Sequence, residues 1–237
     1  MRKAPVNHQK YYGLNFPVEG DSIYATFLWI VTTQVTFVCA FSFPSSIAVV
    51  CGAAYCKSSE VFEYFAEFIL EIRHIVVHRD KMTKLMDMHR LLYELALETE
   101  KVLSPICFLL FCTQSLIMYT SFANYILFKF RDLHSTVVWH TFSALILTPA
   151  CLIGVILCAS KISGQIRLIH TNLQLLYYAL VKESKVDKKI LLLVRTMLRI
   201  EFPEMTAGNI TGLRRKLILS VAGALFTYGL LLVSVIH

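Results

Sequence analysis

The sequence predicts an all-α, polytopic membrane protein with four transmembrane helices and long amphipathic helical extensions in the cytoplasm. Of its 237 residues, 56% are hydrophobic and 16% are charged, whereas an ordinary soluble domain carries about 25% charged residues. The hydrophobic residues are gathered into long blocks. Nine Gly, six Pro and seven Cys are too few for a collagen-like chain, a low-complexity chain or a disulfide scaffold.

Four apolar blocks are each long enough to cross a bilayer, which takes about 20 mostly apolar residues in a helix. Three of them contain no Asp, Glu, Lys, Arg or His, and the fourth contains only His134 and His140 of these residues. Backbone polar groups must be satisfied inside a membrane, so we expect helices. The alternating pattern of a transmembrane barrel strand is absent. The blocks cover residues 23–56, 102–128, 133–160 and 217–236.

These blocks and the polar stretches between them define the expected organisation of the chain. The predicted segments, in order, are a polar non-cytoplasmic N-terminus (1–21), a first span (22–55), cytoplasmic helices (56–101), a second span (102–128), a short outer loop (129–135), a third span (136–160), cytoplasmic helices with a bent approach to the membrane (161–213) and a fourth span (214–237).

The distribution of Lys and Arg predicts the orientation. Residues 57–101 contain seven of them and residues 161–216 contain eleven, whereas residues 1–21 contain three and residues 129–132 contain two. Lys and Arg accumulate in cytoplasmic connections, so we expect both long connections in the cytoplasm and both chain ends on the other side. A basic surplus can also indicate nucleic-acid binding. Here it lies beside the membrane, so we expect no nucleic-acid partner.

The two long connections carry apolar residues at helical steps of three and four. A stripe of this kind needs a partner, either within the subunit or across an interface. The polar segment 182–189 predicts a turn, and Pro203, Gly208 and Gly212 predict a break over 201–212. The stripes are Phe65, Phe68, Ile72 and Ile75; Leu85, Met88, Leu92 and Leu95; and Ile162, Ile166, Ile169, Leu173, Leu176 and Leu180.

Catalytic and metal-binding motifs are absent from the sequence. His74 and His78 stand one helical turn apart, but two imidazoles are an incomplete zinc shell. None of the four apolar blocks contains Asp, Glu, Lys or Arg, which argues against ion-coupled transport. We expect no enzyme activity, no cofactor and no metal.

Aromatic and polar side chains cluster in the predicted spans. Such groups line ligand cavities or hydrogen-bond between packed helices, and the sequence leaves both interpretations open. His140 is either a functional intramembrane group or, beside Trp139, part of an interfacial belt. The candidate ligand-binding residues are Tyr119, Phe122, Tyr125, Trp139 and His140.

Two stretches together resemble one protein family. The first runs from Lys84-Leu-Met-Asp-Met-His-Arg-Leu-Leu-Tyr93 into Phe108-Leu-Leu-Phe-Cys-Thr-Gln-Ser-Leu116 and Tyr119. The second is Phe202-Pro-Glu-Met-Thr-Ala-Gly208, followed by the apolar run that begins at Leu217. They resemble the C-terminal half of arthropod gustatory receptors, the inverted seven-helix chemoreceptor channels related to insect odorant receptors. The likeness is densest over residues 80–130 and 200–232.

The resemblance implies a tetrameric, ligand-gated cation channel in the plasma membrane that responds to a tastant. The subunits would be identical or would include related receptors, and the four spans would correspond to helices four to seven of the family. The last helix would line the pore. Thr227-Tyr228 matches the opening of the family's last-helix signature (Thr-Tyr, five residues, Gln-Phe), although the chain has Ser234 and Val235 where Gln and Phe are expected. The pore or gate residues implied are Thr227, Tyr228, Leu231, Ser234 and Val235.

Two other functions stay open. A truncated subunit could assemble through the cytoplasmic helices and modulate other subunits without conducting ions. The alternative from another class is a small four-helix membrane transporter or enzyme. Asn209-Ile-Thr211 is a formal glycosylation sequon, and the predicted orientation places it in the cytoplasm, where it would stay unmodified.

Overall fold

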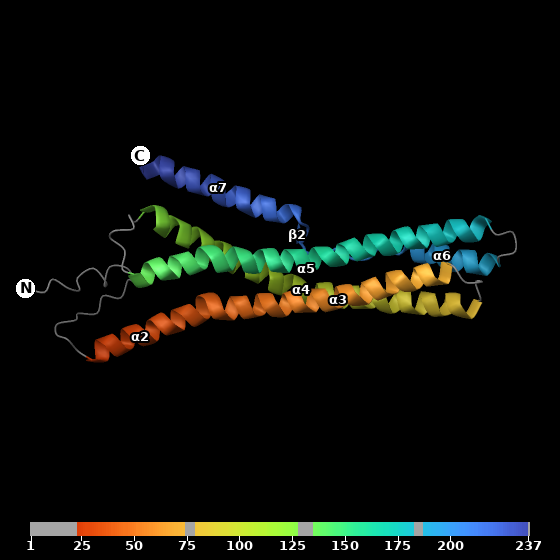
Figure 1. The fold of residues 1–237 in the computed structure, drawn as a ribbon, viewed down its shortest axis with the longest axis horizontal. Helices are drawn as coiled ribbons and strands as arrows, with labels where there is room; N and C mark the ends of the chain where they lie inside the picture. Colours follow the sequence, from red (N-terminus) through yellow and green to blue (C-terminus); the bar gives the residue numbers. More distant parts are fainter. Residues whose placement is uncertain (1–22, 74–78, 128–134, 183–186, 237) are drawn as a thin grey trace, which may run out of the picture. The chain divides into compact units, whose positions relative to one another are not determined.

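The computed structural model describes residues 23–73, 79–127, 135–182 and 187–236. They fold into two units that divide between Ser42 and Phe43. The described residues are almost entirely helical (Figure 1), which confirms the all-α prediction. The predicted N-terminus and nearly all of the predicted outer loop lie outside the described residues, as do His74, Ile75 and His78.

The first unit consists of helix α2 (Ile23–Phe37) and the π-helical turn η1 (Val38–Ser42). The hydroxyl of Thr32 donates a hydrogen bond to the carbonyl of Leu28, and that of Thr36 donates to the carbonyl of Thr32, both at 2.8 Å. Both hydroxyl groups are therefore hydrogen-bonded within their own helix, so they are compatible with an apolar environment. The wide turn ends two residues before Pro44, which has no N–H to continue an α-helical ladder.

The second unit is built from three long helices and four shorter elements. The long helices α3, α4 and α5 pack against one another, α6 covers one end of α4 and α5, and α7 packs mainly on α4 (Figure 1). The elements are α3 (Phe43–Arg73), α4 (Arg79–Leu127), α5 (Ser135–Lys182), α6 (Lys188–Arg199), β1 (Thr206–Ala207), β2 (Thr211–Gly212) and α7 (Lys216–Ile236).

The apolar stripes predicted for the long connections form the core of this unit. On α5, every residue of the stripe is buried except Ile166, which is half-buried. On α3, Phe65 and Ile72 are buried against it. The stripes therefore find their partners within the subunit, and each fully buried Leu or Ile side chain stabilises the bundle by about 1.5–3 kcal/mol.

The stripe predicted on α4 is correct at Leu85 and Leu92 but wrong at its other two positions. Met88 is only half-buried and Leu95 is exposed, whereas His89 and Ala96 are buried. The core face of α4 steps from 85 to 89, 92 and 96, which is also helical spacing. The sequence pattern selected apolar letters and therefore passed over the histidine and the small alanine.

Three helices in the described part of the chain are long and apolar enough to cross a membrane: Ile30–Ile72, Asp80–Ala123 and Ser143–Lys182. A shorter apolar stretch covers Lys216–Leu231 of α7. These helices are compatible with a membrane protein. The 49 residues of α4 extend over about 73 Å at 1.5 Å per residue, more than twice the hydrocarbon thickness of a bilayer.

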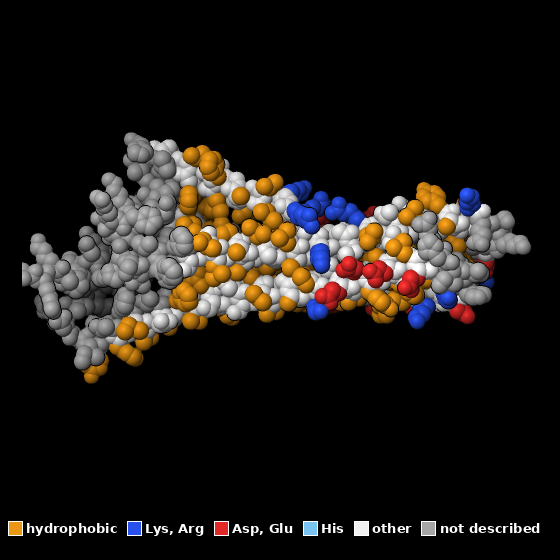
Figure 2. Space-filling view, in the orientation of Figure 1, with side chains coloured by type: hydrophobic (Ala, Val, Ile, Leu, Met, Phe, Trp, Pro, Cys, Tyr) orange, Lys and Arg blue, Asp and Glu red, His pale blue; other side chains and the backbone are white. Residues whose placement is uncertain are grey.

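Surface chemistry divides the second unit in two along its helices. Figure 2 shows hydrophobic side chains over α7 and the neighbouring parts of the bundle, with Lys and Arg side chains first appearing where α7 begins. Beyond this point acidic and basic residues are interspersed with smaller apolar areas. The apolar part corresponds to the predicted spans and the charged part to the predicted extensions.

The segment between α5 and α7 contains one further helix and a hairpin. α5 ends at Lys182 and α6 begins at Lys188, as the polar segment predicts. The carboxylate of Asp187 caps α6 by accepting a hydrogen bond from the backbone N–H of Lys189 at 3.0 Å.

The break predicted over 201–212 is confirmed, and it contains a short hairpin that the sequence did not predict. β1 and β2 pair antiparallel, with Thr206 opposite Gly212. Three residues, 208–210, connect the strands, and Gly208 and Asn209 have φ values of 63° and 57°. Positive φ values at two successive turn residues match the twist of hairpin strands.

Candidate functional site

Each apolar helix of the second unit carries a lysine at the point where its apolar part meets the charged part. These side chains are all exposed. Long basic side chains commonly extend from a helix into the polar headgroup region of a membrane. We refer to these residues, Lys57 of α3, Lys101 of α4, Lys161 of α5 and Lys216 of α7, as the boundary lysines.

Sulfur contacts between the helices bring the boundary lysines of the bundle to a similar level. The thiols of Cys56 on α3 and Cys158 on α5 lie 3.1 Å apart. One residue before Cys56, the hydroxyl of Tyr55 lies 3.5 Å from the sulfur of Cys107 on α4. The three long helices therefore pass from apolar to charged sequence in register.

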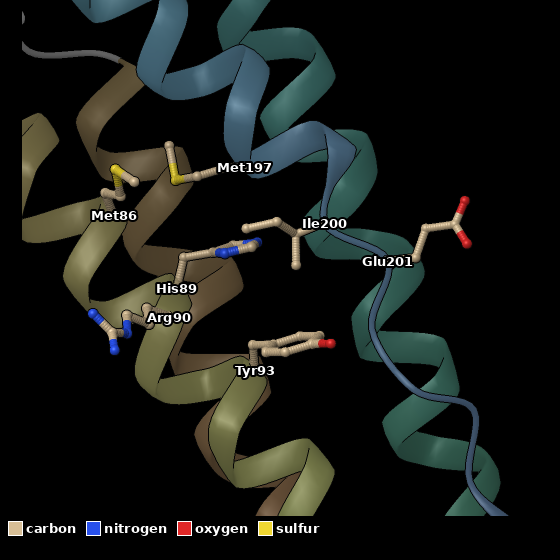
Figure 3. Close-up of a pocket in the computed structure, with 7 residues that line it drawn as sticks. All are labelled: Met86, His89, Arg90, Tyr93, Met197, Ile200 and Glu201. Atoms are coloured by element: carbon tan, nitrogen blue, oxygen red, sulfur yellow. The ribbon is translucent and has the colours of Figure 1, made fainter.

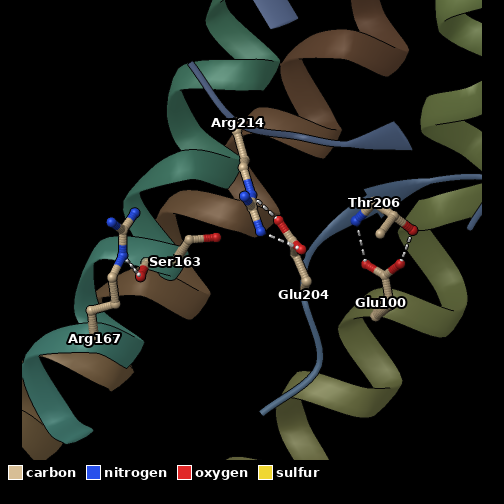
Figure 4. A network of polar contacts seen from close by, with 6 residues as sticks. All are labelled: Glu100, Ser163, Arg167, Glu204, Thr206 and Arg214. Atoms are coloured by element: carbon tan, nitrogen blue, oxygen red, sulfur yellow. Dashed lines mark hydrogen bonds and ion pairs between the residues drawn. The ribbon is translucent and has the colours of Figure 1, made fainter. Parts of the chain in front are cut away.

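The hairpin β1–β2 is hydrogen-bonded to α4 at the same level (Figure 4). The carboxylate of Glu100 accepts two hydrogen bonds from Thr206, one from the backbone N–H at 2.9 Å and one from the hydroxyl. The backbone N–H of Gly208 donates to the carbonyl of Ser104 at 3.0 Å, and that of Asn209 donates to the Ser104 hydroxyl at 3.2 Å. One turn of α4 thus holds both the first strand and the turn of the hairpin.

Gly208 lies in close contact with a second residue of α4. A Cβ at this position would come within 2.8 Å of Cγ of Phe108. The positive φ and the close approach both require glycine. The seating of the hairpin against α4 therefore depends on a residue that has no side chain.

An ion pair closes the base of the hairpin. The guanidinium of Arg214 donates to both carboxylate oxygens of Glu204, with Nη2 2.7 Å from Oε2. This hydrogen bonding lowers the pKa of Glu204, and the positive charges of Lys216 and Arg167 act in the same direction. Figure 4 shows Arg167 of α5 nearby, donating to the backbone carbonyl of Ser163. Glu204 is therefore ionised at neutral pH and ties the start of the hairpin to the start of α7.

A second connection between α4 and α7 lies farther along both helices. The rings of Tyr119 and Tyr228 meet edge to face, with centroids 4.8 Å apart and planes at 77°. Next to them, Gly229 is buried, and a Cβ there would overlap the ring of Phe122. Two of the predicted ligand-binding residues thus contact the helix that carries the predicted pore residues.

The described pore candidates other than Tyr228 lie on the exposed surface of α7. Thr227, Leu231 and Ser234 are all exposed. The hydroxyl of Thr227 donates to the carbonyl of Gly223 at 2.9 Å, and that of Ser234 donates to the carbonyl of Leu231 at 2.8 Å. Both hydroxyls are therefore satisfied within the helix.

Four predicted site residues have side chains outside the described ones: Tyr125, Trp139, His140 and Val235. Their backbones belong to α4, α5 and α7. Among the described residues, no group of three or more His, Cys, Asp and Glu side chains is placed to hold a metal ion.

Sequence reasoning missed the hairpin contacts. Glu100 and Thr206 are 106 positions apart, so no local spacing connects them. A signal was available for Gly208 alone, because glycine is the usual residue where a turn needs a positive φ.

A comparison of the sequence with models of known protein families finds no match, and a comparison with curated proteins finds none. The likeness to gustatory receptors consequently rests on the motif residues quoted above. It provides a proposal for the function rather than an assignment.

Proposed function

We propose that this chain is a subunit of a chemosensory, ligand-gated cation channel of the gustatory-receptor type, located in the plasma membrane. It would correspond to the C-terminal half of the family fold. The observation that carries the proposal is the ring contact between Tyr119 and Tyr228. It joins a helix with candidate ligand residues to the helix that the family resemblance assigns to the pore.

The proposed membrane arrangement has four spans, with α7 as the fourth. The boundary lysines mark the cytoplasmic surface, where basic side chains accumulate. The charged halves of α3, α4 and α5, together with α6, then extend into the cytoplasm, and both chain ends lie on the opposite side. The hairpin and its ion pair lie at the cytoplasmic end of α7.

In the proposed tetramer, the exposed face of α7 lines a central pore. Thr227 and Ser234 supply small polar positions, and Leu231, which is 59% exposed, supplies an apolar one. Four leucine side chains at one level form a hydrophobic constriction that closes a pore by excluding water. We assign the gate to Leu231 on this ground.

The tastant would bind beside Tyr119 and Phe122, with Tyr125, Trp139 and His140 as further candidates. A ligand that displaces the Tyr119 ring loosens the contact with Tyr228, and α7 is then free to move about its hairpin attachment. Aromatic walls favour a small, largely apolar compound with few polar groups. The ligand would shift the equilibrium between the closed and open states because it contacts Tyr119 differently in the two states.

A second candidate function is that of a modulatory subunit that does not conduct ions. The observation that favours it is Ser234-Val235 at the positions where the family signature has Gln-Phe. Such a subunit would still assemble through its helices but would change the current of related subunits rather than carry one.

The two functions are distinguished by recording currents from cells that express the chain alone or with a related receptor. Small aromatic and other largely apolar compounds serve as the ligand panel, and surface biotinylation shows that the chain has reached the membrane. The channel proposal predicts a ligand-evoked cation current. A chain that is present at the surface and gives no current in either setting contradicts it, and a change confined to the partner's current supports the modulatory function.

A further inference from the structure

A cavity of about 340 Å³ lies in the charged half of the second unit, far from the proposed tastant site. It is formed between α4, the end of α6 and the two residues that follow α6 (Figure 3). His89 precedes Tyr119 by thirty residues on the same helix, which corresponds to about 45 Å along α4. The lining residues are Met86, His89, Arg90, Tyr93, Met197, Ile200 and Glu201.

His89 is the polar group at the centre of this cavity. Its side chain is 1% exposed, and its ring points across the cavity toward Ile200 (Figure 3). The rings of Phe202 and Phe65 flank it, with centroids 5.0 and 6.0 Å away. Nε2 has no hydrogen-bond partner among the described residues. A buried polar nitrogen without a partner is unfavourable, so a hydrogen-bonding ligand in the cavity would relieve a cost.

The two charged residues that line the cavity point away from its interior. Arg90 donates to Glu94 at 3.1 Å and points away from His89. The carboxylate of Glu201 also points away, and Glu201 is exposed. Burial lowers the pKa of His89 to about 4, so the imidazole is neutral at physiological pH. The interior therefore offers no charge to attract an anion or a cation.

The remaining walls favour an aromatic ligand. Met86 and Met197 both line the cavity (Figure 3), and thioether sulfurs make favourable contacts with aromatic rings. Tyr93 is half-buried, and its ring packs edge to face on Phe202 at 5.9 Å. The volume is at the lower end of the range for small-molecule sites, about 300–1,000 Å³.

We propose that this cavity is a second ligand site, which takes a small neutral aromatic molecule with one hydroxyl group. The ring lies among Met86, Met197 and Ile200, and the hydroxyl forms a hydrogen bond with Nε2 of His89. The site is independent of the proposed channel function.

Binding of p-cresol to the purified full-length chain in lipid nanodiscs tests the proposal, with toluene as the probe that lacks the hydroxyl. Saturation-transfer NMR at increasing probe concentration separates saturable binding from partition into lipid. We expect saturable binding of p-cresol, about tenfold tighter than that of toluene because of the hydrogen bond. Binding of p-cresol that does not saturate, or equal affinity for the two probes, overturns the proposal.

Two variants and a matched control locate the site. His89→Phe keeps an aromatic ring but removes the nitrogen, so p-cresol should bind no tighter than toluene. Met197→Trp fills the cavity and should abolish saturable binding of both probes, which keeps the test decisive if the first variant misfolds. His170→Phe changes an exposed histidine of α5 and should leave both affinities unchanged. Unaltered p-cresol binding in Met197→Trp would place the probe elsewhere and overturn the proposal.

Discussion

Tyr119 and Tyr228 meet edge to face across the contact between α4 and α7, with their ring centroids 4.8 Å apart. The same two helices are also joined through the hairpin, where Glu100 of α4 accepts two hydrogen bonds from Thr206. α7 is therefore attached to α4 at two places. One lies near the boundary lysines, and the other lies more than two turns into the apolar part of α7. The proposed gating motion depends on the second attachment being the weaker one.

The strength of that attachment is tested by Tyr119→Ala. An edge-to-face ring pair contributes about 0.5–1.5 kcal/mol beyond its buried area, so removal should lower the free energy of unfolding by at least that much. Tyr119→Phe keeps the ring and should lose little. Thermal unfolding in detergent measures both variants, with Tyr64→Ala, at an exposed tyrosine of α3 (65% exposed), as the control. Equal losses at Tyr119 and Tyr64 would refute the contact.

The seating of the hairpin is tested by Gly208→Ala. The new Cβ meets Phe108 at 2.8 Å and the backbone has a positive φ, so we expect a loss of about 1–3 kcal/mol in stability. Gly164→Ala is a matched control, because a Cβ at that helical position has no atom within 4 Å and alanine favours a helix. The double variant Gly208→Ala, Phe108→Ala should recover part of the loss in a thermal unfolding assay. No loss in Gly208→Ala would show that the hairpin is not seated as described.

The ion pair between Glu204 and Arg214 predicts a pH dependence of stability. Arg214 holds the pKa of Glu204 below its ordinary value of 4.5, so the folded state favours the ionised form. The resulting stabilisation is present above pH 4.5 and is lost as the pH falls through the lowered value. Both side chains are about half exposed, which limits the contribution to about 1 kcal/mol or less.

Chemical unfolding of the wild type and of Glu204→Gln, repeated across pH, measures this contribution. The difference in unfolding free energy should be present at pH 7 and should disappear in acid. Glu98→Gln provides a control at a more exposed carboxylate, which is 3.7 Å from Lys101. A difference that grows as the pH falls would contradict the assigned ion pair.

The orientation is tested at Asn209, the acceptor of the Asn-Ile-Thr sequon. Asn209 is exposed in the turn of the hairpin, so access does not prevent modification. If the boundary lysines mark the cytoplasmic side, a glycosidase should cause no change in electrophoretic mobility of the chain expressed in eukaryotic cells. An engineered sequon close to residue 5 supplies the positive control. Glycan at Asn209 would reverse the assigned orientation.

Helical periodicity made much of this fold accessible from the sequence, because the information is local. The stripe from Ile162 to Leu180 places its residues in the core since steps of three and four keep them on one face of α5. The break before α7 is likewise encoded locally, by Pro203, Gly208 and Gly212. Features that depend on the nearest few residues were therefore predicted correctly at these positions.

Contacts between distant segments were not accessible in the same way. Asn172 of α5 donates a hydrogen bond to the carbonyl of Ala66 on α3 at 3.1 Å, and such a pair depends on the register of two packed helices. His89 lies between Leu85 and Leu92 at helical spacing, so its burial could have been inferred, but its unpaired nitrogen could not. A search for apolar residues at helical spacing overlooks the polar residues that lie on the core face of a helix.

The central claim is that α7 carries an ion-conducting gate at Leu231. Its most direct test is the basal current through cells that express Leu231→Ser, with or without a related receptor, compared with wild type at equal surface expression. A polar ring should remove the dewetting barrier and raise a basal cation current, whereas Leu157→Ser, at an exposed leucine of α5, should leave it unchanged. If Leu231→Ser reaches the surface and passes no more current than Leu157→Ser in either setting, α7 does not gate a pore.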